Sequence, residues 1–386
     1  MLKHSPPLPL VIDYYAEGRD ITTGDEEGII LVLKQQRDRV LRVRLDLPLT
    51  SLQIVVAAMD DEYPILEYLI ILHQVEGNDA ILRFPETLQV PHLRQLVLRG
   101  FAFPIGLLTA AESLVTLYLS MIIPSTYFHP NALLRCISFM PHLETLAIKF
   151  KYPIPNHGAE GQLTRMPDIT PVTLPTLHYF EFRGGSAYLE ALVYRITILH
   201  LETIHIEFFN QLKFSIPRLV QLMGAAENLR RFDSANLSFS VDHVDVAIHP
   251  HGGLRMYAVA IFVFCWHLDW QVSSAAQISN SLHQMFSAVE HLNLSQYEHD
   301  LSSEEHNEVD RTVWRKLLRP FRNVKTLRIK DKLVKDLARC LQLEDGELPL
   351  ELLPELQELA CDTGDAFTSF IDARQNAGRP ITLVPR

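Results

Sequence analysis

The residues best able to do chemistry in this chain are its 17 histidines and four cysteines, which can act as bases, metal ligands or nucleophiles. Their spacing matches none of the patterns that such chemistry requires. The chain has no H-E-x-x-H, no Cys and His ligands at zinc-site spacing, no G-x-S-x-G, no Walker loop and no G-x-G-x-x-G. The sequence therefore predicts no catalytic residue, no metal ligand and no cofactor, and we expect that the protein is not an enzyme.

The nearest approach to a reactive pair is Cys265 with His267. Side chains two residues apart on a strand share one face, so the two groups could meet there. The run from Tyr257 to Trp266 is almost entirely apolar, however, and a cysteine in such a run is usually buried and inert. We therefore interpret Cys265 as a core residue of a buried strand.

Four histidines mark a repeated position instead. His92, His142 and His200 each come directly before a leucine that opens a similar segment, and His178 lies one place off. Because the position recurs with the segment, we interpret these histidines as structural.

The segment that these histidines mark has the pattern apolar-x-x-apolar-x-apolar. Its copies are HLRQLVL, SLVTLYL, HLETLAI, TLHYFEF, HLETIHI, VEHLNL, NVKTLRI and ELQELAC, with a degenerate copy in NLRRFDS and looser ones in RVLRVRL and ILEYLII. This is the core of a leucine-rich repeat, in which a short strand alternates its side chains between two faces. One repeat cannot bury its own apolar face, whereas stacked repeats can.

We therefore predict an α/β leucine-rich-repeat solenoid, with parallel strands on the concave face and helices and irregular turns on the convex face. The segments between repeats support this, because apolar residues recur there at helical spacing. The expected helices are Pro217–Glu227, Ser274–Val289, Glu304–Leu318 and Asp331–Leu343. The alternation also predicts one continuous core that buries Leu96, Leu117, Leu146, Ile204, Leu292 and Leu327.

The domain prediction is a single leucine-rich-repeat domain over residues 1–386. Atypical ends must cover the exposed core of a solenoid, so we assign 1–38 as the N-terminal cap and 362–386 as the C-terminal cap. The repeats occupy 39–361, with a long loop at 151–175 that is rich in proline and glycine. The register within 234–272 stays open, because the stretch SVDHVDVAIHP and the apolar run after it allow one extra strand or several.

Composition limits the partners and the compartment. The net charge of −11 and a pI near 5.8 argue against nucleic acid, which requires a basic stripe. The longest apolar run is about half of the roughly 20 residues that a membrane span needs, and the N-terminus has no apolar secretory segment. Four unpaired cysteines fit a reducing compartment. We expect the cytoplasm, the nucleus or both.

The positions between the core residues of each strand face the concave side. They mix both charge signs with tyrosine, and Tyr and Arg often supply the binding energy of protein interfaces. Reversing the charges of Glu181 and Arg183 is expected to impair binding while leaving stability nearly unchanged. The predicted partner-binding residues are Arg99, Tyr118, Lys149, Tyr179, Glu181, Arg183, His205 and Glu207.

The chain resembles the F-box leucine-rich-repeat proteins of mushroom-forming fungi. The resemblance spans essentially the whole chain and lies in SPPLPLVIDYY, DEEGIILVLKQQRDRVLRVRL, DEYPILEYLII, LPTLHYFEFRG, HLDWQVSSAAQI, LLPELQEL and TGDAFTSFIDARQNAGRPITLV. It implies a non-catalytic recognition module that selects proteins for ubiquitylation. The alternative is an interaction scaffold with no link to a ubiquitin ligase.

One departure from that family concerns the F-box itself. In such proteins an F-box of about 45 residues precedes the S-P-P-L-P-L segment and docks the Skp-type linker of the ligase, whereas here only four residues precede Ser5. The Skp-type linker is therefore expected as a partner only if an upstream F-box exists. The protein partner of the concave face is not identified by the sequence.

Overall fold

The computed structural model describes residues 8–15, 21–73, 81–153, 171–211, 213–230, 232–250, 257–296, 309–344, 347–348, 350–361 and 364–384. Contacts divide the chain into two compact units, Met1–Leu201 and Glu202–Arg386, and each is described by itself. Both units are α/β, and most of their strand pairs are parallel. The boundary between them falls directly after Leu201, the residue that opens one of the predicted repeats.

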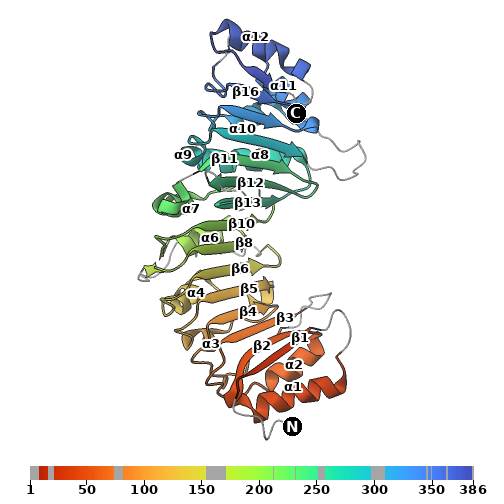
Figure 1. Ribbon diagram of the computed structural model, residues 1–386, viewed down its shortest axis with the longest axis vertical. Coiled ribbons are helices and arrows are strands. Elements are labelled where there is room, and N and C mark those ends of the chain that lie inside the picture. Colours follow the sequence, from red (N-terminus) through yellow and green to blue (C-terminus); the bar gives the residue numbers. More distant parts are fainter. Residues whose placement is uncertain are drawn as a thin grey trace. The chain divides into compact units, whose positions relative to one another are not determined.

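In the main sheet of unit 1 the strands follow the order of the sequence, and every neighbouring pair is parallel. Figure 1 shows β2, β3, β4, β5, β6 and β8 stacked in this order. The strands are β1 Leu10–Tyr15, β2 Val40–Leu47, β3 Tyr68–His73, β4 Gln95–Arg99, β5 Thr116–Ile122, β6 Thr145–Phe150 and β8 Tyr179–Gly184. The helices are α1 Thr23–Gln35, η2 Arg37–Arg39, α2 Leu49–Ala57, α3 Ile105–Thr109, η3 Pro124–Thr126, α4 Pro130–Ile137 and α6 Ser186–Val193.

The same backbone geometry begins successive strands of unit 1. A tight turn places the first leucine of the segment, as in Leu93, whose N–H donates to the carbonyl of Val90 at 3.1 Å, and Leu114, whose N–H donates to Ala111 at 3.2 Å. Two consecutive N–H groups at the strand start then donate to one carbonyl of the previous repeat. The amides of Arg94 and Gln95 thus share the carbonyl of Glu67, at 2.8 and 2.9 Å. We call this feature the shared carbonyl.

The core of unit 1 follows the predicted alternation. Leu96, Leu117 and Leu146 are fully buried, and they lie side by side in register on β4, β5 and β6. Helices α3, α4 and α6 pack in succession, α3 against α4 and α4 against α6. A small second sheet pairs β7 Val172–Thr173 with β9 Ile196–Thr197 in parallel. Most of the predicted loop at 151–175 lies outside the described residues.

Unit 2 contains eight strands in the order β10-β13-β12-β11-β14-β15-β16-β17 among the residues described. They are β10 Thr203–Phe208, β11 Phe232–Phe239, β12 His243–Pro250, β13 Val259–Phe264, β14 His291–Gln296, β15 Thr326–Ile329, β16 Glu358–Ala360 and β17 Thr382–Val384. The helices are α7 Pro217–Ala225, η4 Glu227–Arg230, α8 Leu268–Ser281, α9 His283–Phe286, α10 Arg311–Leu318, η5 Asp331–Leu333, α11 Val334–Leu341, η6 Gly364–Phe367 and α12 Thr368–Asn376.

Unit 2 repeats the shared carbonyl and the buried alternation. The amides of Lys325 and Thr326 both donate to the carbonyl of Glu290, at 2.8 and 3.0 Å. Leu292 and Leu327 are fully buried and lie in register on β14 and β15, and Ile204 is fully buried on β10. The predicted burial is thus confirmed at all six positions.

The expectation of parallel strands fails at β12, which is antiparallel to both β11 and β13. A two-residue turn explains the reversal, because the N–H of Ser240 donates to the carbonyl of His243 at 2.8 Å, and so short a loop can join only antiparallel strands. The chain then returns along β13, which pairs in parallel with β10. The described residues of 234–272, which leave out 251–256, thus form β11, β12 and β13, followed by the start of α8.

Several helix and strand ends differ from the sequence interpretation, and the predicted helix Ser274–Val289 is divided between α8 and α9. The run Tyr257–Trp266 was expected to be buried strand, but β13 ends at Phe264 and the Trp266 side chain is exposed. Helix α8 begins at Leu268, ahead of the predicted Ser274. Helix α10 begins at Arg311 with Asp310 as its N-cap, and residues 304–308 of the predicted helix lie outside the described residues.

Candidate functional site

The structure brings six of the eight predicted partner-binding residues onto one sheet face of unit 1. They alternate with the buried core residues along β4, β5, β6 and β8, and neighbouring strands lie about 4.8 Å apart. In register, Tyr118 pairs with Ala147, which pairs with Glu181, and Lys149 pairs with Arg183. We call this the open face of unit 1. Its predicted members are Arg99, Tyr118, Lys149, Tyr179, Glu181 and Arg183.

Lys149, on β6, contacts residues of both neighbouring strands of the open face. Its Nζ is 2.6 Å from Oε1 of Glu181 on β8, and it also lies 5.7 Å from the ring centroid of Tyr118 on β5. A cation over a tyrosine ring is attracted by the negative ring face. One lysine therefore ties three neighbouring strands together through an ion pair and a cation–π contact.

Glu181 differs from its expected role. It was predicted as a solvent-facing contact residue, but it is only 5% exposed, and its carboxylate faces Lys149. A charge held this far from water depends on its partner, so reversing it removes more than a surface contact. The expectation that stability stays nearly unchanged in a Glu181 and Arg183 reversal is therefore revised.

Sequence reasoning missed the part of the open face that lies on β2 and β3. Arg42 and Arg44 are exposed on β2, and the Arg42 guanidinium carbon lies 4.7 Å from the ring centroid of Tyr68, its partner in register. Tyr68 pairs in turn with Gln95 on β4, which continues the row across the face. The alternation in RVLRVRL carries the signal for these positions, but that copy fits the repeat pattern only loosely.

The middle of the open face is apolar. Ile70 and Val97 are half-buried neighbours in register, and Val97 pairs with Tyr118. Arginine and tyrosine side chains thus surround a short apolar strip. An apolar centre with Arg and Tyr around it is the usual composition of a protein-binding patch.

The remaining two predicted residues, His205 and Glu207, lie on β10 in unit 2. The His205 Nε2 is 3.4 Å from Oε1 of Glu207, and the His205 ring lies between Tyr257 and Phe262, with centroid separations of 5.9 and 4.9 Å. The side chains of His205 and Glu207 are 16% and 14% exposed. They form a partly buried pair in a polar and aromatic part of the unit 2 sheet.

Cys265 is buried, as interpreted from the sequence. Burial, together with the carboxylates of Asp269 and Asp242, raises the pKa of its thiol to about 12. The pKa of Cys340 is also raised to about 12 by burial, and that of Cys136 to about 11. The thiolate form that a nucleophile needs is therefore disfavoured at all three. His267 is the N-cap of α8, so it does not share a strand with Cys265.

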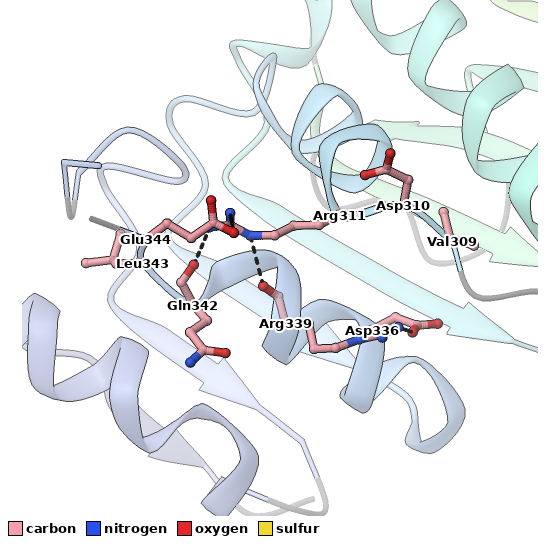
Figure 2. A pocket seen from close by; sticks show the side chains of 8 residues that line it. All are labelled: Val309, Asp310, Arg311, Asp336, Arg339, Gln342, Leu343 and Glu344. Atoms are coloured by element: carbon pink, nitrogen blue, oxygen red, sulfur yellow. Dashed lines mark hydrogen bonds and ion pairs between the residues drawn. The ribbon is translucent and has the colours of Figure 1, made fainter. Parts of the chain in front are cut away.

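A cavity of about 530 Å³ lies in unit 2 between the start of α10 and α11. Figure 2 shows the Arg311 side chain reaching across to Gln342 and Glu344, while Asp336 and Arg339 lie along α11. The Arg311 Nε donates to the carbonyl of Arg339 at 3.2 Å, and Arg339 pairs with Asp336 at 2.6 Å. Both arginines are thus held by groups of the cavity wall, and we interpret the cavity as part of a structural ion-pair network.

Among the described residues, the structure contains no helix that is both long enough and apolar enough to span a lipid bilayer.

Comparison with models of known protein families finds no match, and comparison with curated proteins finds no similar sequence.

Proposed function

We propose that the chain is a leucine-rich-repeat recognition module without catalytic activity, which holds a protein partner on the open face of unit 1. The repeated tight turn and shared carbonyl support the assignment to leucine-rich repeats, because both units begin successive strands in the same way. The open face corresponds in this proposal to the concave face of the solenoid.

One observation carries the proposal. The open face combines exposed arginines, half-exposed tyrosines and an apolar strip on strands whose core side is fully packed. The packed core beneath such a face fixes its main chain, so binding does not have to order the backbone. Arg42, Arg44 and Arg99 are its exposed cations, and they favour a partner with an acidic contact surface.

The link to ubiquitylation rests on the resemblance to F-box leucine-rich-repeat proteins. If it holds, the partner is a substrate, and the module belongs to a ligase adaptor. If it does not, the same face serves an interaction scaffold. Sequencing the transcript upstream of Met1 separates the two, because only the adaptor requires an encoded F-box.

The test of recognition is affinity purification of the chain followed by mass spectrometry, with variants that differ only in the open face. Neutralising Arg42, Arg44 and Arg99 to glutamine is expected to weaken capture of the main partner at least about tenfold, since interface arginines are frequent hot spots. Arg135→Gln is the matched control, because Arg135 is exposed on α4, in the helix layer. Equal capture by the triple variant and by the wild type, with both folded, would place the partner elsewhere.

A further inference from the structure

Two of the three tryptophans of the chain are exposed, and both lie in unit 2, four residues apart in the sequence. Trp266 is 71% exposed and Trp270 is 49% exposed, whereas the third, Trp314, is fully buried. Trp266 lies between the end of β13 and the start of α8, and Trp270 lies in the first turn of α8. Exposed tryptophan is unusual on a soluble surface and is enriched at interfaces, where the indole supplies a large, stiff contact area.

The backbone beneath these tryptophans is held firmly. Gln271, which is 1% exposed, donates from Nε2 to the carbonyl of Ser240 and to the carbonyl of Cys265, both at 2.8 Å. The N–H of Cys265 donates in turn to the carbonyl of Asp242 at 2.8 Å. These hydrogen bonds tie the β11–β12 turn to the junction between β13 and α8. The ring of His267 also contacts the Trp270 ring edge-on, with 5.1 Å between the ring centroids. The two tryptophans therefore belong to a main-chain frame that is held by hydrogen bonds and consists of the β11–β12 turn and the β13–α8 junction.

Two carboxylates belong to the same frame. Asp242 is in the β11–β12 turn, its side chain is 46% exposed, and its Oδ1 is 2.7 Å from Nδ1 of His243. Asp269 is in the first turn of α8, and one of its oxygens is buried with no hydrogen-bond partner among the described residues. Both carboxylates lie close enough to the Cys265 thiol to help raise its pKa. The surface thus offers aromatic faces together with negative charge.

We propose that this edge, formed by Trp266, Trp270, Asp242 and Asp269, docks an arginine- or lysine-containing peptide segment of another protein. A guanidinium or ammonium group stacks on indole more strongly than on the other aromatic rings, and a nearby carboxylate completes the contact with a charge-assisted hydrogen bond. The net charge of −11 attracts such a segment over a distance and opposes docking of a second copy of the chain. The proposed peptide site uses none of the residues of the open face of unit 1. An experiment can therefore contradict one of the two binding proposals without contradicting the other.

The experiment measures fluorescence anisotropy of a labelled peptide of four Gly-Arg pairs titrated with the full chain at physiological ionic strength. Trp266→Ala with Trp270→Ala is expected to weaken binding about tenfold. Asp242→Asn is expected to weaken it about threefold, because one carboxylate is lost while the indoles remain. Bound peptide should also shield the indole fluorescence of Trp266 and Trp270 from acrylamide, while the emission of buried Trp314 stays unchanged.

The controls separate this site from general attraction to an acidic protein. Phe139→Ala removes another exposed aromatic side chain, in unit 1, and should leave binding unchanged. A peptide of four Gly-Glu pairs should not bind. If circular dichroism shows that the double variant is unfolded, the single variant Trp266→Ala is measured in its place. Equal affinity of the tryptophan variants and the wild type overturns the proposal, as does wild-type dimerisation in sedimentation experiments that Trp266→Ala abolishes.

Discussion

Protonation of the Asp245 carboxylate should make the unfolding free energy of unit 2 depend on pH. It lies on β12, in register between Ser238 and Phe262. Loss of water around it raises its pKa from 3.8 to about 6, an effect that nearby His243 partly opposes. The folded state therefore binds the proton more tightly than the unfolded chain. The stabilisation is complete below about pH 4 and is lost as the pH rises through about 6.

Asp245→Asn should remove this pH dependence. At pH 7 the wild type carries a poorly solvated carboxylate, so the variant is expected to be more stable by on the order of 1–2 kcal/mol. Below about pH 4 the two should be equally stable. Urea unfolding monitored by circular dichroism from pH 4 to 7 measures the difference. Asp372→Asn, an exposed change on α12, should track the wild type throughout, and a constant offset for Asp245→Asn would refute the assignment.

The Lys149–Glu181 pair predicts an unequal response to charge changes on the open face. Glu181→Lys puts a second positive charge beside Lys149 at a buried position, and we expect it to cost about 2–4 kcal/mol of unfolding free energy. Arg99→Glu changes an exposed residue of the same face and should stay within about 0.5 kcal/mol. Chemical denaturation compares them. A Glu181→Lys variant as stable as the wild type would show that the carboxylate has a freer environment than its 5% exposure indicates.

At the scale of elements, an ion-pair network joins α10 to the segment that follows α11. Arg315 is buried, and its Nη2 is 2.8 Å from Oε2 of Glu351 while its Nη1 is 3.1 Å from Oε2 of Glu347. Arg319 also pairs with Glu351, at 3.0 Å, and Arg311 pairs with Glu347, at 2.6 Å. The N–H of Glu344, together with Arg311 and Arg315, lowers the pKa of Glu347, so the carboxylate stays ionised at neutral pH. The arginines follow each other four residues apart on one side of the helix.

Arg315→Lys tests the geometry of this network. Lysine keeps the charge, but it cannot reach two carboxylates with a planar pair of N–H groups, so we expect unit 2 to lose about 2 kcal/mol of stability. The same change at Arg319, which is 58% exposed, should cost less than about 0.5 kcal/mol. Thermal unfolding with and without added salt measures the loss of stability in both variants. Equal losses would assign the effect to helix propensity or general charge rather than to bidentate pairing.

Strands and helices whose apolar residues recur at a regular spacing could be predicted from the sequence. Features that depend on contacts with residues far away in the sequence could not. The leucines of the repeat alternate regularly, which fixed the buried face, and Pro217 correctly marked the start of α7. The reversal at β12 escaped prediction because its turn, at Val241 and Asp242, lacks the glycine that usually signals a two-residue hairpin. Position along a strand indicated that Glu181 faces away from the core, but its burial depends on the lysine contributed by β6.

The candidate site was recovered from the sequence in part. Parity placed Arg99, Tyr118 and Lys149 on one face, because the period of a strand is fixed by its backbone. The ion pair and the cation–π contact follow from rotamers and from strand register, and neither is encoded in local sequence. Trp266 shows the converse error, since an apolar run predicted burial, while the end of β13 turned that side chain outward.

At the scale of the whole molecule, the shared carbonyl has a consequence for how such a chain changes over generations. The junction between one repeat and the next is made by main-chain amides, and every residue except proline carries one. A gene segment that encodes one such strand and its turn can therefore be duplicated or deleted with this main-chain contact kept, while its buried leucines meet equivalent leucines of the next strand. The area of the outward-facing sheet surface can then grow or shrink in steps of one strand, while the side chains on that surface diversify separately.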